Sequence, residues 1–221
     1  MPELTEDQIA ERVARDLEDG WYVNLGVGSP LSVLNHIRAD LEVMFHSENG
    51  ILGLGPSPAP GQEDPDIVNA GKQFATVNRG GCFFDSSVSF AIVRGKHLDL
   101  AVVGAYQVSQ YGDLANWKMP SQKIGGVGGA ADLAVGAKRL WVMMSQTTKD
   151  GNPKIVKECT FPLTAKRAVS RIYTELAVFD VTTQGLVLRD LSPGLSVEDV
   201  ARKTGAPFRV ISYDDSHSAS Y

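Results

Sequence analysis

The chain has 221 residues, of which 43% are hydrophobic and 21% are charged, and its formal net charge at pH 7 is -5. This is the composition of a globular protein that can bury a sizeable core, and it provides no general basic field that would recruit nucleic acid. Only two cysteines occur, Cys82 and Cys159, and because they lie far apart and outside any C-x-x-C pattern we expect neither a disulfide framework nor a zinc site.

The first predicted elements are an amphipathic helix and a strand that ends in a glycine turn. A capping box that begins at Thr5, followed by apolar residues four apart, predicts a helix over residues 6–19. Residues 21–25 have the pattern of a strand, which runs into the glycine turn at residues 26–28. Ser29 is placed to cap the next helix. Strand, glycine turn and helix together indicate the start of a βαβ unit.

A second strand, over residues 43–46, breaks into Ser47-Glu48-Asn49-Gly50. Glycines and prolines continue to residue 58, so we expect a long loop here. Beyond it, helical and strand patterns alternate. They predict a helix capped by Asp85 or Ser86 that runs to Arg94, a strand over residues 98–103, a helix over residues 129–138 and a strand over residues 140–144.

The last part of the chain has a different character. Two strand patterns, over residues 176–181 and 186–191, flank a short turn and predict a β-hairpin. Ser196 then caps a final helix that ends at Gly205. The whole succession predicts an α/β fold with an open, mostly parallel sheet, helices on both faces and a C-terminal β-hairpin and helix. We expect one domain over residues 1–221.

Several classes of protein do not fit the sequence. Residues 1–7 are polar and acidic, unlike a secretory signal, and no apolar stretch is long enough to span a bilayer. The four histidines, His36, His46, His97 and His217, show no spacing that would place two of them on one helical turn, so we expect no metal site. We therefore expect a protein of the reducing cytoplasm that binds neither membrane nor nucleic acid.

Candidate functional residues lie in the loops. Glu48 follows a strand at the start of a glycine-rich loop, where open α/β sheets bind ligands, and is a candidate nucleophile; the alternative is a solvated or helix-capping Glu. Glycine loops at residues 26–28, 50–55 and 125–129 could offer backbone N–H groups to a phosphate or an oxyanion, or could serve turn geometry only. Lys72 could reach an anion, or could be an ordinary solvated lysine.

Ser47-Glu48-Asn49-Gly50 followed by Ile51-Leu52-Gly53-Leu54-Gly55-Pro56 resembles the active-site signature in the B subunit of the family I CoA-transferases. The resemblance extends from about Glu11 to Val210. Five further blocks resemble that family in the same order: Asn24-Leu25-Gly26-Val27-Gly28, Asn69-Ala70-Gly71-Lys72, Gly112-Asp113-Leu114-Ala115-Asn116-Trp117, the glycine run at residues 125–129 with Asp132-Leu133, and Cys159-Thr160-Phe161-Pro162-Leu163-Thr164. Six blocks in order are more specific than any single glycine motif.

The resemblance implies a NagB/RpiA-like CoA-transferase fold and a role for each matching residue. Glu48 would attack an acyl-CoA thioester to give a mixed anhydride, which the released CoA thiolate converts into a glutamyl-CoA thioester. The backbone N–H of Gly129, or of its neighbour Gly128, would stabilise the oxyanion together with a donor from a companion subunit. Asn24 and Lys72 match positions that contact CoA or the acyl group.

The resemblance also implies partners and substrates. A companion A subunit would complete a heterodimer or heterotetramer, with coenzyme A as a substrate and no tightly bound cofactor. Residues 55–61 and 69–73 resemble most the transferases that pass CoA from succinyl-CoA to 3-oxoadipate, while the acetoacetate-type 3-oxoacid transferases share most of the same blocks. Ser145-Gln146-Thr147 departs from the family, whose members usually carry an acidic residue followed by histidine; this departure could alter specificity or only packing.

Two other classes of function compete with CoA transfer. A noncatalytic sensor on a similar scaffold would bind a sugar phosphate or an acyl-CoA, and it would have no use for an accessible Glu48. A thioester hydrolase would use the same carboxylate as a base, or would form an anhydride that water resolves. It would release free acid and free CoA without needing an acceptor.

Overall fold

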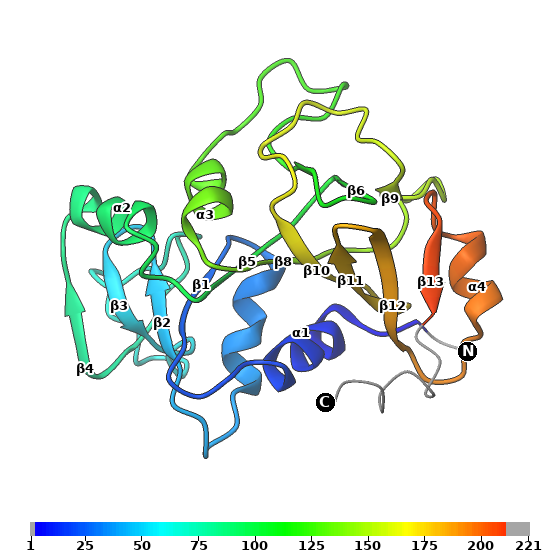
Figure 1. Ribbon diagram of the computed structural model, residues 1–221. Coiled ribbons are helices and arrows are strands. Elements are labelled where there is room, and N and C mark those ends of the chain that lie inside the picture. Colours follow the sequence, from blue (N-terminus) through cyan, green and yellow to red (C-terminus); the bar gives the residue numbers. More distant parts are fainter. Residues whose placement is uncertain (1–2, 211–221) are drawn as a thin grey trace, which may run out of the picture.

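A ten-stranded sheet runs through the computed structural model, which describes residues 3–210 (Figure 1). Its strand order is β13-β12-β11-β10-β8-β5-β1-β2-β3-β4. The strands, in chain order, are β1 (Tyr22–Leu25), β2 (Met44–Ser47), β3 (Ile51–Leu54), β4 (Val77–Phe83), β5 (Leu100–Val103), β8 (Leu140–Met143), β10 (Val169–Tyr173), β11 (Ala177–Thr182), β12 (Gly185–Leu191) and β13 (Phe208–Val210). A separate three-stranded sheet is formed by β6 (Gln107–Ser109), β7 (Leu114–Ala115) and β9 (Ile155–Val156).

The centre of the large sheet is parallel and its flanks are largely antiparallel. Strands β2, β1, β5, β8 and β10 pair in parallel in that order. At one edge β3 and β4 add antiparallel strands, and at the other edge the β11–β12 hairpin does the same before β13 pairs in parallel with β12. The predicted α/β fold, with its mostly parallel sheet and C-terminal hairpin, is confirmed. The direction of winding reverses between β1 and β5, which is where sheets of this kind bind ligands.

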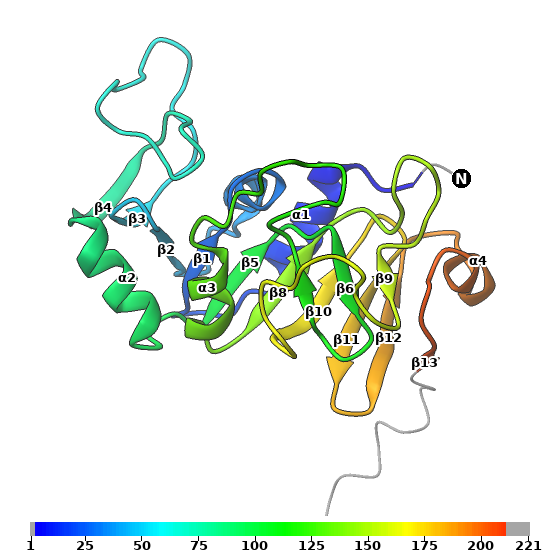
Figure 2. The ribbon, with the colours of Figure 1, turned by 90° about the horizontal axis from the view of Figure 1, so that it is seen from above.

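Helices cover both faces of the sheet (Figure 2). Each face has its own hydrophobic core, which lies between the sheet and the helices. The helices are α1 (Glu6–Arg15), the 3-10 helix η1 (Ser29–His36), α2 (Ser86–Arg94), α3 (Ala130–Gly136) and α4 (Val197–Arg202). On one face α1 and η1 bury residues such as Val13 and Val33 against the strands. On the other face α2, α3, α4 and the small sheet bury residues such as Val93, Leu133 and Val200.

Local sequence signals account for several helix ends. The capping box at Thr5 is present, with its hydroxyl accepting from the N–H of Gln8. Asp85 caps α2, and a second capping box begins at Ser196. The predicted cap at Ser29 is wrong, because Gly28 occupies the cap position of η1 with a φ of 96° and no side-chain hydrogen bond.

The prediction of one long loop after Ser47 is also wrong. Residues 51–54 form β3, which turns back antiparallel to β2, and β4 then pairs with β3. The glycines are part of the reason: Gly53 has a φ of 84°, and an added Cβ would lie 2.8 Å from Gly81 Cα, so this position needs glycine inside a strand. Glu48 therefore lies in a tight turn between two strands rather than at the start of a loop.

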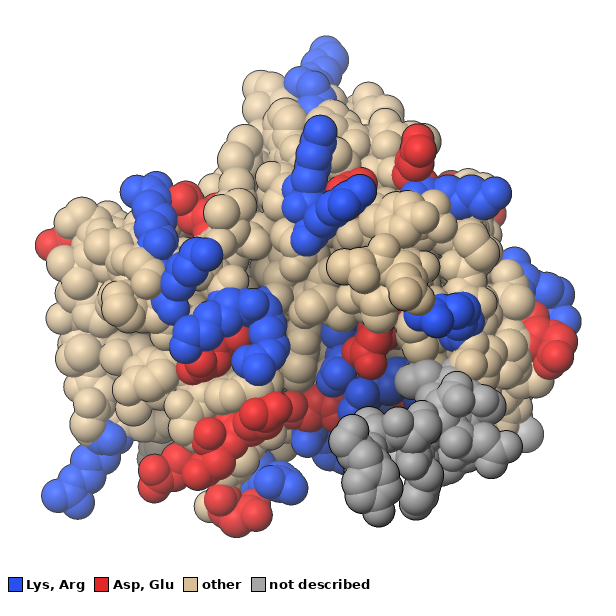
Figure 3. All heavy atoms as spheres, viewed as in Figure 1, with Lys and Arg blue, Asp and Glu red and all other residues tan. Residues whose placement is uncertain are grey.

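The cysteines, the charged surface and the possible membrane and metal sites can be compared with the sequence predictions. Both cysteines are free. Asp and Glu side chains form a band across the lower part of the face in Figure 3, with Lys and Arg side chains around it. Within residues 3–210 no helix is long and apolar enough to cross a membrane, and no cluster of three metal-binding side chains occurs. His217 lies outside the described residues. The division of the chain into domains stays a prediction.

Candidate active site

A cleft of about 1120 Å³ opens at the carboxyl ends of the five parallel strands. Residues within two positions of each strand end line it: Gly26 after β1, Glu48 after β2, Gly104 after β5, Met144 after β8 and Glu175 after β10. The glycine run before α3 contributes residues 126–129 to the same cleft. The cleft therefore includes the point between β1 and β5 where ligands bind in open α/β sheets.

The turn that carries Glu48 is fixed by its backbone. Gly50 donates its N–H to Ser47 O (3.0 Å) and accepts from the N–H of Phe84 (3.0 Å), and its φ is 117°. A Cβ at Gly50 would lie 2.0 Å from Phe84 O, so only glycine fits. The amide of Asn49 donates to Val68 O (2.7 Å). These bonds hold the half-buried Glu48 between β2 and β3 with its side chain in the cleft.

Glu48 and Gly129, which are far apart in the sequence, meet at this site. A Cβ built on Gly129 would lie 2.9 Å from Glu48 Oε2 and 3.1 Å from Glu48 Cδ, so the carboxylate rests against bare backbone. Gly128 precedes it with a left-handed φ of 51°, and Gly129 has a φ of -83°. Two successive residues with left-handed and then right-handed backbone conformation turn their N–H groups toward the same point, where they can bind an anion. The N–H groups of Gly128 and Gly129 precede the first residue of α3 and are not used in the hydrogen bonds of that helix.

The electrostatic surroundings of Glu48 favour its protonated form. Burial raises the pKa of the Glu48 carboxyl above its ordinary value, and the nearby negative charge of Asp132 raises it further. Asp132 is itself ion-paired with Arg94, at 2.8 Å between Nε and Oδ1. Burial also removes the water that would otherwise solvate the ionised carboxylate, so the ionised form is a better nucleophile than a surface glutamate.

Asp132→Asn is expected to lower the pKa of Glu48, because it removes one of the two causes that raise it. The predicted role of Glu48 as nucleophile requires the ionised carboxylate, so we expect activity to be lost as the pH falls through this pKa. The acid limb of a pH profile of kcat/KM should therefore move to lower pH in the variant. Arg94→Ala is the matched control: it leaves the charge of Asp132 uncompensated and should move the limb to higher pH. An acid limb that is unchanged in Asp132→Asn would contradict this account.

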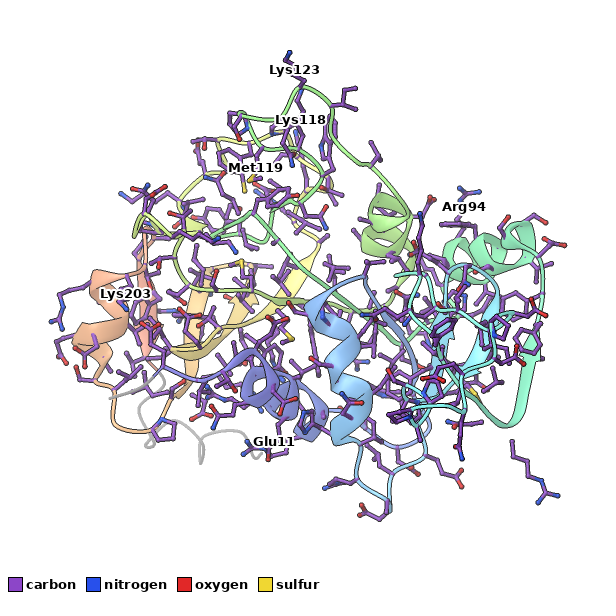
Figure 4. All side chains as sticks on the ribbon, turned by 180° about the vertical axis from the view of Figure 1, so that it is seen from behind. Glu11, Arg94, Lys118, Met119, Lys123 and Lys203 are labelled. Atoms are coloured by element: carbon purple, nitrogen blue, oxygen red, sulfur yellow. The ribbon has the colours of Figure 1, made fainter. Side chains whose placement is uncertain are left out.

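Two loops form the wall of the cleft above the sheet. Asn116 N donates to Thr164 Oγ1 (3.1 Å), Thr164 Oγ1 donates to Asn116 Oδ1 (2.7 Å), and Trp117 Nε1 donates to Leu163 O (3.2 Å). Asn116 and Phe161 line the cleft. Two of the sequence blocks that resembled the CoA-transferases thus pack against each other. The loop continues past Lys118, Met119 and Lys123, which Figure 4 shows standing above the sheet.

Asn24 lies beneath the cleft. It is 1% exposed, and its Nδ2 donates to His46 O (3.1 Å) and is 3.0 Å from His46 Nδ1. Asn24 Oδ1 is buried and has no hydrogen-bond partner within residues 3–210. Asn24, which the sequence singled out, thus packs behind the Glu48 turn and has one acceptor atom without a partner.

Lys72 lies beside the cleft on an adjacent loop. It is exposed, has a φ of 62° and donates its backbone N–H to Asn69 O (2.9 Å). A Cβ on the preceding Gly71 would lie 3.4 Å from Val27 Cγ1, and Val27 lines the cleft. Of the five residues singled out from the sequence, the structure brings Glu48, Gly128 and Gly129 together on the cleft surface, and places Asn24 and Lys72 around it.

Ser145 and Gln146, where the sequence departs from the family pattern, lie in different places, one in the cleft and one in the interior. Ser145 lines the cleft and accepts from Lys154 Nζ (3.2 Å), whose pKa is lowered by burial and raised in part by Glu175. Gln146 is fully buried; its backbone N–H donates to Glu175 Oε2 (2.9 Å) and its side chain donates to Thr204 Oγ1 (2.7 Å). A change at Ser145 can therefore reach a ligand, whereas a change at Gln146 affects packing.

Sequence reasoning did not single out three residues near Glu48. They are Asp132, which raises the pKa of Glu48, His46, which bonds to Asn24, and Phe90, whose Cζ would lie 3.1 Å from a Cβ on Gly129. Asp132 appeared only within a matching block, and His46 was taken as an incidental histidine. Phe90 gave no signal, because an apolar residue in an amphipathic helix is normally a core residue. The position of His46 two residues before Glu48 was the one available clue.

Comparisons with known proteins identify the family of the chain. The family model described as Coenzyme A transferase matches residues 6–203. The chain is 52% identical over 204 residues to the B subunit of 3-oxoadipate CoA-transferase from Acinetobacter baylyi, covering 92% of this chain and 94% of that protein. It is 53% identical to the human mitochondrial succinyl-CoA:3-ketoacid coenzyme A transferase 2, of which it spans 40%.

Solved structures share the fold at low identity. An acyl-CoA transferase (YdiF) from Escherichia coli O157:H7 superposes with a TM-score of 0.72 at 20% identity, over 96% of this chain and 42% of that chain. Glutaconate coenzyme A-transferase from Acidaminococcus fermentans gives a TM-score of 0.69 at 16% identity, over 95% of this chain and 89% of that chain. With the family match over most of its length and relatives above half identity, the chain belongs to the coenzyme A transferase family.

Proposed function

We propose that this chain is the catalytic subunit of an enzyme that passes CoA from succinyl-CoA to 3-oxoadipate, with Glu48 as the nucleophile. The observation that carries the proposal is the position of Glu48. Its half-buried carboxylate rests against the backbone of Gly129, in a large cleft at the carboxyl ends of the parallel strands. A sensor domain would have no need for a desolvated carboxylate beside backbone donors.

The chemistry proceeds by two attacks in each of two half-reactions. Glu48 attacks the thioester carbonyl of succinyl-CoA, and the C–S bond breaks to give a succinyl-glutamyl anhydride and the CoA thiolate. The thiolate attacks the glutamyl carbonyl of this anhydride, which releases succinate and leaves a glutamyl-CoA thioester. The carboxylate of 3-oxoadipate then attacks this thioester, and the same steps in reverse give 3-oxoadipyl-CoA and free Glu48. No metal or bound cofactor enters the scheme.

Each attack produces an oxyanion that needs oriented donors. The N–H groups of Gly128 and Gly129 are the donors proposed on this chain, because Gly129 lies against the Glu48 carboxylate and α3 does not use these two N–H groups. One such donor typically contributes about 3 kcal/mol to transition-state stability. Lys72 is proposed to contact CoA or the acyl group through its ammonium group. Asn24, for which the same contact was expected, is 1% exposed and has a buried Oδ1, so it is proposed to support the Glu48 turn from behind.

A companion A subunit is part of the proposal. The bacterial relatives are named as B subunits, and the human relative is a longer chain of which this one spans 40%. Water would hydrolyse both covalent intermediates, so the cleft must be closed during turnover. Apolar side chains that line the same cleft as Glu48 are left exposed, Val27 at 57% and Val127 at 52%. A second chain that covers them would complete the site and exclude water.

The choice of acceptor acid is supported by the relatives. Relatives named for 3-oxoadipate match at 52% and 51% identity over nearly their whole length. The alternative acceptor is acetoacetate, because relatives named for 3-ketoacids match at 53% in human and 46% in Bacillus subtilis. Among the relatives that this chain spans almost completely, those named for 3-oxoadipate are more similar to it, which favours 3-oxoadipate.

A direct assay separates these possibilities. The chain is co-purified with its companion subunit, and CoA transfer from succinyl-CoA is measured with 3-oxoadipate and with acetoacetate. We expect transfer to either acid to exceed release of free CoA, and kcat/KM to be higher for 3-oxoadipate. Equal or greater kcat/KM for acetoacetate would overturn the choice of acceptor. Release of CoA at the same rate without any acceptor would indicate a hydrolase instead.

A further inference from the structure

Three buried side chains form a hydrogen-bonded series directly behind the nucleophile, and the proposed chemistry leaves the middle one without a role. His46 and Ser89 are fully buried and Asn24 is 1% exposed. His46 Nδ1 is 3.0 Å from Asn24 Nδ2, and His46 Nε2 is 3.0 Å from Ser89 Oγ. The series joins β1, β2 and α2.

The hydrogen bonds fix the tautomer of His46. Asn24 Nδ2 can only donate, so His46 Nδ1 must accept. The proton of the neutral ring then lies on Nε2, which donates to Ser89 Oγ. Burial lowers the pKa of His46 to about 4, so the ring is neutral at physiological pH. The ring also stacks on Phe84, with a centroid separation of 6.1 Å and an interplanar angle of 19°. His46 therefore has one defined orientation.

Helix α2 connects the series to Glu48 and Gly129. Phe90 follows Ser89 in this helix, and a Cβ built on Gly129 would lie 3.1 Å from Phe90 Cζ and 2.9 Å from Glu48 Oε2. The same helix packs closely on α3, because a Cβ on Gly136 would lie 2.3 Å from Val93 O. The place of α2 relative to β2 therefore sets the place of the start of α3 relative to Glu48.

We propose that His46 is a positioning residue. By bonding Ser89 of α2 and Asn24 of β1, it holds the Glu48 turn and the backbone of Gly129 at the separation that the acyl transfer needs. The inference rests on the proposed function. Misplacement of a reacting group by about 1 Å can cost on the order of 100-fold in rate, so a small shift of α2 is enough to be measured.

Ser89→Ala removes one hydrogen bond of the series and leaves the cleft surface intact. In the complex with the companion subunit we expect kcat to fall about 10-fold, with KM for succinyl-CoA changed less than about twofold, because positioning affects the chemical step more than binding. The matched control is Val200→Ala, a core truncation in α4, at a fully buried position outside the cleft. It should lower the melting temperature at least as much while kcat stays within about twofold.

A pair of substitutions at His46 tests which bond matters. His46→Gln can place an amide N–H near the position of Nε2 and so keep the donor to Ser89. His46→Asn can keep an acceptor for Asn24 but not that donor. We expect His46→Gln to retain more of kcat than His46→Asn. If either variant does not fold, the comparison of Ser89→Ala with Val200→Ala decides alone.

Three results would overturn the proposal. They are a kcat of Ser89→Ala within about twofold of the unmodified enzyme, an equal loss of kcat in Val200→Ala, or a His46→Asn variant as active as His46→Gln. Failure of the proposed function is distinguishable, because then the unmodified complex would not transfer CoA or would not depend on Glu48. A dependence on Glu48 without a dependence on Ser89 rejects the positioning role only.

Discussion

Replacing Glu48 with alanine is expected to lower CoA transfer by at least about 10⁴-fold, because no other group can carry the covalent intermediates. The melting temperature should change little, since the side chain is only half buried and makes no hydrogen bond within the described residues. The measurement is the initial rate of transfer by the purified complex. Intact mass after incubation with succinyl-CoA should show a CoA adduct on the unmodified chain and none on the variant.

Two further substitutions sharpen this test. Glu48→Gln keeps the shape and removes the charge, so it should be as inactive as alanine. Glu48→Asp keeps the charge and withdraws the carboxylate by one methylene, which should leave activity reduced by roughly 100-fold. Near-normal transfer by Glu48→Ala would reject the covalent mechanism. Equal activity in Glu48→Asp and Glu48→Gln would indicate that the charge is not what the reaction requires.

Gly129→Ala is expected to lower kcat by roughly 100-fold while the fold is retained. The added methyl would lie 2.9 Å from Glu48 Oε2, closer than the two groups can approach. The atom in the way is the end of a flexible side chain, so the carboxylate moves aside at little cost in folding free energy. It then leaves the position beside the backbone donors. Steady-state kinetics and a melting curve of the same preparation separate the two effects.

The neighbouring Gly126 provides the matched control. An added Cβ at Gly126 has no heavy atom within 4 Å, so Gly126→Ala should keep kcat within about twofold of the unmodified enzyme. Gly128→Ala differs from both, because its φ of 51° strains any side chain and can disturb the loop itself. If Gly126→Ala lost as much activity as Gly129→Ala, the loop would tolerate no side chain at either position. The contact with Glu48 would then not explain the effect of Gly129→Ala.

The sequence predicted the elements whose signals are local. Caps at Thr5, Asp85 and Ser196 were readable because the hydroxyl or carboxylate and the N–H groups that it caps lie within three residues of each other. The β11–β12 hairpin was readable for a similar reason, since its turn joins two strand patterns directly. Strands of two or three residues, such as β7 and β9, are too short for any periodicity to appear.

The sequence by itself determined the fold class and the candidate nucleophile. Apolar periodicity specifies which faces of the elements are buried, and the residues that single out Glu48 are consecutive in the chain. Only the tertiary structure decided that Gly129 rests against that carboxylate, that Asp132 raises its pKa and that Asn24 bonds to His46 instead of facing the cleft. The physical reason is distance along the chain. Contacts between residues on different elements depend on how strands and helices pack, and no local pattern of residues encodes that packing.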